Sequence, residues 1–236
     1  MLSEYQGRQR CNLYKTAVRM AENQDIQRFL NDDLRLLNLA IKSREQRFKT
    51  SHESHLALMG LQNQRSLVEN QLLILTNRQE VLRLQRNELA TGKSPSSLPV
   101  IVSLTAPRFS NPGQMIMGNF QLRILAATSN GAFDAFRSGL KMEAARLIVE
   151  INNLAAEYAL FSDELQLRRQ ESVAAALVGV EAGRLSLADV IIQKRLLIQD
   201  GMKMARLRSR QHELLADLVY LCGANSYEDL LRGHDK

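Results

Sequence analysis

The chain of 236 residues has no tryptophan, only 5% aromatic residues, four prolines and two cysteines. A strand-rich domain would need more aromatic and β-branched residues than this, whereas Leu, Ala, Gln and Arg, which are abundant here, favour helices. Hydrophobic residues make up 45% of the chain, which is too many for a disordered protein. The composition therefore predicts a mainly α protein.

Other features are missing as well. Cys11 and Cys222 lie far apart, with no ligand cluster beside either, so we expect neither a disulfide nor a metal site. No apolar run is long enough to span a bilayer as a helix, and no apolar run precedes Cys11. As written, the chain therefore shows no signal peptide and no lipobox.

The net charge is +6, but acidic and basic residues alternate along the chain, so no basic block predicts a nucleic-acid partner. No phosphate-cradling glycine loop or nucleophile elbow is present, which predicts neither an enzyme nor a cofactor. His52 and His55 in "HESH" are three residues apart, whereas the zinc-protease motif needs a spacing of four. These two histidines favour a solvated turn without a metal.

Apolar residues recur at alternating steps of four and three along four segments, the spacing typical of coiled-coil helices. The first segment runs from Leu13 to about Phe48, and the second runs from about Ser54 to Thr91. The third begins near Ala132 and continues to Gly183, with Tyr158 and Phe161 expected in its core. The fourth starts near Ser186 and ends at Gly223. The third segment has the most regular spacing: Leu147, Ile151, Leu154, Tyr158, Phe161 and Leu165.

The stretch between the second and third segments is different in kind. It contains prolines, glycines and β-branched residues, and we expect short strands around 100–104 and 115–125 with a turn at Asn130-Gly131. The predicted organisation is a first helical hairpin over 1–95, an extended or β connector over 96–131, and a second helical hairpin over 132–236.

The two hairpins also resemble each other. A shift of 132 residues places Phe48 on Val180 and Ser54 on Ser186. This match predicts an internal repeat of two long antiparallel coiled-coil hairpins. The turns would lie near 48–54 and within "VEAGRLSLADV" (180–190), where Gly183 permits a tight turn and Ser186 caps the returning helix.

The segment "LVGVEAGRLSLADVIIQKRLLIQDGMKMARLRSRQHELLADLVYLCG" (177–223) resembles the second-repeat signature of the TolC family of outer-membrane efflux channels, and "NPGQMIMGNFQLRIL" resembles the approach to it. The resemblance covers roughly 30–223. It implies a homotrimeric periplasmic tunnel for passive export of solutes in a tripartite efflux or type I secretion system. The implied partners are a periplasmic adaptor (a membrane fusion protein) and an inner-membrane transporter, and the implied location is the outer membrane and periplasm.

In that family the hairpin tips constrict the pore and meet the adaptor. The resemblance assigns these adaptor-binding or gating roles to two groups of residues. They are Val180, Gly183, Arg184, Leu185, Ser186 and Asp189 in the second tip, and Phe48, Ser51, His52 and Ser54 in the first. The other interpretation is that these residues only close a hairpin.

The chain departs from the family before its first tip, where only about 45 residues, all helical in pattern, replace a strand pair. The connector is also short for a membrane-spanning strand hairpin. We therefore expect a shortened or incomplete relative. The alternative function is a soluble coiled-coil scaffold, or a degenerate fragment of an efflux protein, that binds partner helices through exposed heptads.

Overall fold

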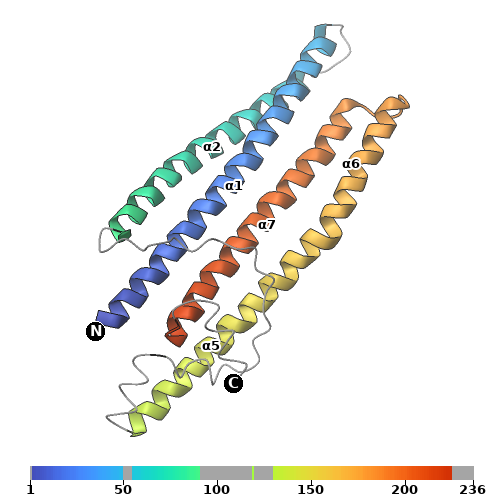
Figure 1. Cartoon of the computed structure of the whole chain (residues 1–236). Coiled ribbons are helices and arrows are strands. Elements are labelled where there is room, and N and C mark those ends of the chain that lie inside the picture. Colours follow the sequence, from blue (N-terminus) through green and yellow to red (C-terminus); the bar gives the residue numbers. More distant parts are fainter. Residues whose placement is uncertain (1, 50–54, 91–118, 120–129, 225–236) are drawn as a thin grey trace. The chain divides into compact units, whose positions relative to one another are not determined.

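The computed structural model describes residues 2–49, 55–90, 119 and 130–224. Its elements follow the chain in the order α1 (Leu2–Lys49), α2 (His55–Ala90), α5 (Asn130–Ala159), the π-helix η2 (Leu160–Leu165), α6 (Gln166–Glu181) and α7 (Leu187–Cys222) (Figure 1). Every element over these residues is a helix, which confirms the mainly α fold class. None of these helices is long and apolar enough to cross a membrane.

The predicted helix boundaries agree with the structure to within a few residues, except at two places. Helix α1 begins at Leu2, well before the predicted start at Leu13. The predicted turn at Asn130-Gly131 is wrong, because α5 already begins at Asn130. The first N–H groups of a helix have no partner within the helix, so a pair of residues typical of turns can stand at its start. The predicted strands lie outside the described residues.

The helices divide into two compact units, each of which takes a part of several helices. The first unit comprises Met1–Met20, Leu82–Glu157 and Leu207–Lys236, and the second comprises Ala21–Val81 and Tyr158–Arg206. This division by contact differs from the division by hairpin, which remains a prediction from the sequence.

In the first unit, α5 packs against the end of α7 through a continuous apolar core. Ile151 and Leu218 are fully buried at its centre, and Leu147 and Leu214 are almost so. Burying one such side chain contributes about 1.5–3 kcal/mol, so this core dominates the stability of the unit. Helix α7 then ends at Gly223 as predicted: the φ of Gly223 is 68°, its N–H donates to the Tyr220 carbonyl, and the Ala224 N–H donates to the Val219 carbonyl.

The same unit joins α1 to α7 through polar side chains. The Tyr14 hydroxyl lies 2.9 Å from Nδ1 of His212, a histidine that is only 1% exposed. Lys15 pairs with Asp217, and Arg19 lies 2.5 Å from Glu213. The two ion pairs show that α1 and α7 are antiparallel here: Arg19 is one turn after Lys15 in α1, and its partner Glu213 is one turn before Asp217 in α7.

In the second unit, α1 lies between α2 and α7. Leu30 and Leu37 of α1 are buried with Val68 of α2 and Ala205 of α7. The buried amide of Asn23 donates to the Leu75 carbonyl and to Gln79, both 2.8 Å away, and so fixes α2 on α1. Helix α6 packs on α7, where Arg169 forms an ion pair with Asp200 at 3.2 Å. The order of contacts is therefore α2, α1, α7, α6, with α2 and α6 at the two edges.

The third predicted helix is interrupted by the π-helix at Leu160–Leu165, which the regular spacing of its apolar residues did not predict. Tyr158 and Phe161 are both only partly buried, so the expectation that they belong to the core is wrong for both. The Phe161 ring instead meets the Lys203 ammonium group, 4.2 Å from its centre. A π turn accommodates one extra residue, so the buried face of α6 is rotated relative to that of α5. Ala176 is buried on this face of α6.

Candidate functional site

Backbone hydrogen bonds form the turn between α6 and α7 and terminate α6. The Gly183 N–H donates to the Val180 carbonyl at 3.0 Å, and the Arg184 N–H donates to the Gly179 carbonyl at 2.8 Å. Together with the φ of 68° at Gly183, these bonds form a Schellman motif. A side chain at Gly183 would strain this backbone, so the glycine has a structural role here.

A second glycine shapes the turn from the helix side. A Cβ atom on Gly179 would lie 2.6 Å from Cδ1 and 2.9 Å from Cγ of Leu185. Leu185 therefore folds back over the end of α6, in a space that exists only because Gly179 has no side chain. The sequence interpretation named Leu185 but missed Gly179, although a glycine four residues before the turn glycine was a visible signal.

The returning helix is closed by Ser186 and Asp189. The backbone N–H and the hydroxyl of Ser186 each donate to Oδ2 of Asp189 at 2.8 Å. These hydrogen bonds from Ser186, first the backbone one and then the hydroxyl one, lower the pKa of Asp189. Ser186 directly precedes α7, as its predicted capping role requires, but its hydroxyl donates to a carboxylate instead of accepting from a helix N–H.

The turn presents an exposed surface of mixed character. Arg184 and Glu181 are exposed, while Leu185 and Leu187 keep 44% and 42% of their surface in solvent. Val180, Ser186 and Asp189 are partly buried. A guanidinium group beside two half-exposed leucines can form hydrogen bonds and apolar contacts with the same partner.

The first predicted tip is described only in part. Phe48 belongs to α1, but its side chain lies outside the description, as do Ser51, His52 and Ser54 altogether. His55 opens α2 and is exposed. Among the described residues, no group of three or more His, Cys, Asp or Glu side chains could hold a metal ion.

Next to the second tip, a buried ion pair connects α1 to α7. Arg195 lies 2.6 Å and 3.1 Å from the two carboxylate oxygens of Asp33, and its third nitrogen lies 2.5 Å from Gln64 of α2. The Asp33 side chain is 9% exposed and that of Arg195 is 22% exposed. One guanidinium group therefore joins three helices, a contact that the sequence interpretation missed because its partners are 162 and 131 residues away.

This ion pair borders a small cleft of about 200 Å³ in the second unit, and α7 contributes its first turns to that cleft. Its lining combines apolar and basic groups, and it begins beside the tip. The lining residues are Ala40, Ser43, Arg44, Leu61, Gln64, Leu187, Ala188, Ile191, Ile192 and Arg195.

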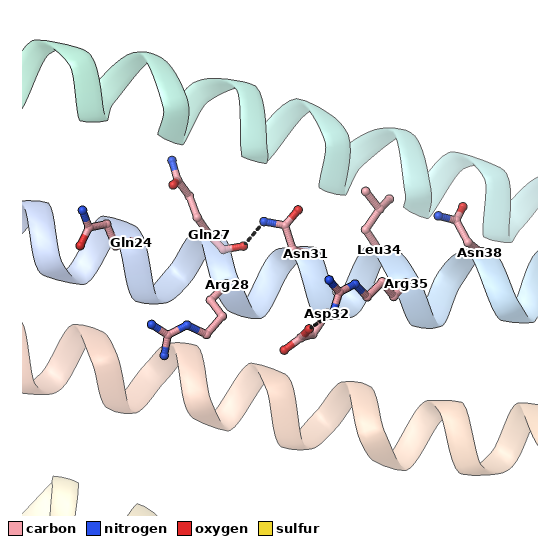
Figure 2. Close-up of a pocket in the computed structure, with 8 residues that line it drawn as sticks. All are labelled: Gln24, Gln27, Arg28, Asn31, Asp32, Leu34, Arg35 and Asn38. Carbon is pink, nitrogen blue, oxygen red and sulfur yellow. Dashed lines mark hydrogen bonds and ion pairs between the residues drawn. The ribbon is translucent and has the colours of Figure 1, made fainter.

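A wider and shallower groove of about 540 Å³ follows the outer surface of α1 (Figure 2). Figure 2 shows that polar side chains dominate it, with Asp32 paired to Arg35 at 3.3 Å and the Asn31 amide donating to the Gln27 carbonyl at 2.8 Å. Seven of its eight lining residues are polar or charged, and Leu34 is the exception. The surface of this groove is therefore mainly polar.

Comparisons with solved structures identify the class of fold. The chain superposes on CusC, whose crystal structures concern folding and transmembrane channel formation, with a TM-score of 0.75 at 10% identity, covering 91% of this chain and 76% of that one. It also superposes on the outer membrane protein VceC from Vibrio cholerae, with a TM-score of 0.63 at 14% identity, covering 91% of this chain and 69% of VceC.

No protein-family model and no curated protein matches the chain in sequence. The helical fold of the chain is similar to that of these two proteins, which confirms the resemblance to the TolC family at the level of the fold.

Proposed function

We propose that the chain forms the helical wall of a TolC-like export channel, in which three copies surround a tunnel for passive export of solutes. Its fold is similar to that of CusC and VceC, and packing, not chemistry, would be its mechanism. The proposed location is the outer membrane and periplasm.

The observation that carries this proposal is the placement of exposed apolar side chains. Thirteen of the eighteen large apolar side chains that are exposed among the described residues belong to α2 or to the α5–η2–α6 helix. Ten of the thirteen lie in the second unit, where α2 and the η2–α6 segment are the edges and the central α1 and α7 expose few such side chains. Apolar edges of this kind mark surfaces that bind other protein. The thirteen are Leu56, Met59, Leu67, Leu73, Ile74, Val81, Leu84, Met142, Val149, Leu160, Leu167, Leu177 and Val178.

The native mass of the particle tests the proposal. Light scattering of the purified chain, with and without mild detergent, should give a mass of three copies. A monomer in both conditions would contradict the tunnel and favour the alternative, a coiled-coil scaffold that uses the same exposed surfaces for partner helices.

We further propose that the second tip docks a periplasmic adaptor. The exposed Arg184 and the half-exposed Leu185 support this role, because both are held in place by the glycines and hydrogen bonds of the turn. Replacing either residue with aspartate should weaken adaptor binding at least about tenfold, the effect of losing one central contact. The control is Glu171→Lys, an exposed charge change on α6 away from the turn, which should leave binding unchanged.

A further inference from the structure

In the first unit, α5 and α1 are held on α7 by different kinds of contact. The apolar core around Ile151 and Leu218 is formed by α5, by α7 and by Ala224, and among the described residues it includes none from α1. Leu13 and Val18 of α1 are buried, but neither belongs to that core. The part of α1 that belongs to this unit, residues 2–20, is called the N-terminal arm below, and its hydrogen bonds and ion pairs with α7 are all made by side chains of the arm.

His212 of α7 lies among these polar contacts and is poorly placed to carry a charge. Its ring is 1% exposed, and Nδ1 lies 2.9 Å from the Tyr14 hydroxyl of the arm. The other ring nitrogen, Nε2, is buried and has no hydrogen-bond partner among the described residues. A protonated imidazole is a donor at both nitrogens. Protonation would therefore place a positive charge on a buried ring that has no acceptor at Nε2, which is unfavourable.

The charges around the ring do not compensate such a proton. Burial, the larger cause, and the guanidinium group of Arg208 one turn earlier in α7 lower the pKa of His212 from 6.5 to about 4. No charge from the described parts of α1, α2 or α5 contributes to this shift. The arm residues next to Tyr14 and one turn after it, Lys15 and Arg19, are cations that are each paired with a carboxylate of α7. The ring therefore faces a hydroxyl group from the arm and a like charge from its own helix.

We propose that mild acid releases the N-terminal arm of α1 from α7, while α5 remains packed on α7. Moving the arm away removes Tyr14 from Nδ1 and exposes the ring of His212 to water, where a proton binds without the cost of burial. The core between α5 and α7 contains no group that gains a charge in acid, so this contact keeps its strength. The inference concerns contacts within one chain and depends neither on the proposed channel nor on the number of copies.

The size of the effect follows from the two environments of the ring. With a pKa of about 4 in the docked arm and 6.5 in the released one, the equilibrium for release should rise about twentyfold between pH 7 and pH 5. The sign is fixed because the released state has the higher pKa and binds the proton first as the pH falls. At higher pH the ring is neutral in both states, and release no longer depends on pH.

The two native cysteines report on the two contacts of α7 separately. Cys11 belongs to the arm, where its Sγ lies 3.5 Å from the Ala216 carbonyl, and Cys222 is 2% exposed in the core between α5 and α7. The unaltered chain is treated with a dithiodipyridine reagent at pH 7 and pH 5, and mass spectrometry follows each thiol. Each rate is divided by the rate of the same thiol in urea at the same pH, which removes the intrinsic effect of pH on thiol reactivity.

Acid should raise the normalised rate of Cys11 by between about threefold and about twentyfold and change that of Cys222 by less than about twofold. An equal rise at both thiols would mean that acid opens the whole unit. An unchanged rate at Cys11 would mean that the arm stays docked. Either result would overturn the proposal, and neither depends on a variant that has to fold.

Replacement of His212 tests whether this ring is the group that responds. His212→Gln cannot gain a charge, so the normalised rate of Cys11 in this variant should be the same at pH 7 and pH 5. The matched control is His55→Gln, which removes an exposed histidine at the start of α2 and should keep the wild-type response. A response that persists in His212→Gln would assign the acid effect to other groups and refute the role of His212.

Discussion

The contact between Gly179 and Leu185 predicts that Gly179→Ala changes the stability of the protein in opposite directions depending on the residue at position 185. Replacing a helical glycine with alanine stabilises a helix by about 0.8–1 kcal/mol. At Gly179 the new Cβ would lie 2.6 Å from Cδ1 of Leu185, which has to move. Overpacking of this kind costs about 1–3 kcal/mol, near the lower end here because the atoms displaced first belong to the end of a flexible side chain.

We therefore expect Gly179→Ala to leave stability unchanged or to lower it by about 1 kcal/mol in the wild type, and to raise it by about 1 kcal/mol in a Leu185→Ala background. The coupling free energy would be about 1–2 kcal/mol, well above the error of additivity. Urea unfolding followed by circular dichroism measures all four proteins of the cycle.

The matched control is Gly139→Ala in α5, where an added Cβ meets nothing within 4 Å. This variant should be stabilised by about 1 kcal/mol whatever residue stands at position 185. If Gly179→Ala is equally stabilising and its effect adds to that of Leu185→Ala, then Leu185 does not fold over the end of α6, and our description of the turn is wrong.

Three further predictions concern α1 and α7. Arg195→Met should lower the free energy of unfolding by about 2–3 kcal/mol, because it leaves the buried Asp33 carboxylate unpaired. Arg35→Met, in the exposed pair with Asp32, should change it by less than about 0.5 kcal/mol. Equal effects of the two variants in urea unfolding would count against a stabilising role of the Arg195–Asp33 ion pair. Gly201→Ala should lower stability by up to about 2 kcal/mol, because its Cβ would lie 2.6 Å from the Phe29 ring and the overpacking cost of about 1–3 kcal/mol is offset in part by about 1 kcal/mol of helix gain; in a Phe29→Leu background the same change should stabilise the protein by about 1 kcal/mol in the same assay. Burial and the nearby Arg208 charge lower the pKa of His212 to about 4, below its value in the unfolded chain. As the pH falls, the unfolded chain therefore binds a proton at His212 before the folded protein does, and the free energy of unfolding decreases. Between pH 7 and 5 this loss should be about 2 kcal/mol and absent in His212→Gln, and an unchanged pH dependence in that variant would refute the assignment.

The long helices could be predicted because their signal is local and repeated. Leu75 and Leu82, or Leu207 and Leu214, are seven residues apart, and such spacing has one simple structural meaning. The end of α7 at Gly223 and the start of the same helix after Ser186 also follow from nearby residues. These features involve only positions within a few turns of one helix.

What the sequence could not provide depends on distant partners or on local strain. In the sequence Arg195 cannot be distinguished from the many other charged residues, because its partners Asp33 and Gln64 are close to it only in the folded chain. The π-helix is hidden because Phe161 and Leu165 continue the apolar spacing of α5, and only packing against α7 shows that the helix has shifted.

The π-helix at Leu160–Leu165 has a consequence for how this chain can change its length. A residue added to or removed from an α-helix rotates everything beyond it by about 100°, which turns the buried face towards solvent. At a π turn the extra residue is already absorbed, so deleting one residue there restores a regular helix and leaves the seams on both sides facing as before. This short segment is therefore the place within the α5–η2–α6 helix where evolution could delete one residue at the lowest cost to the fold.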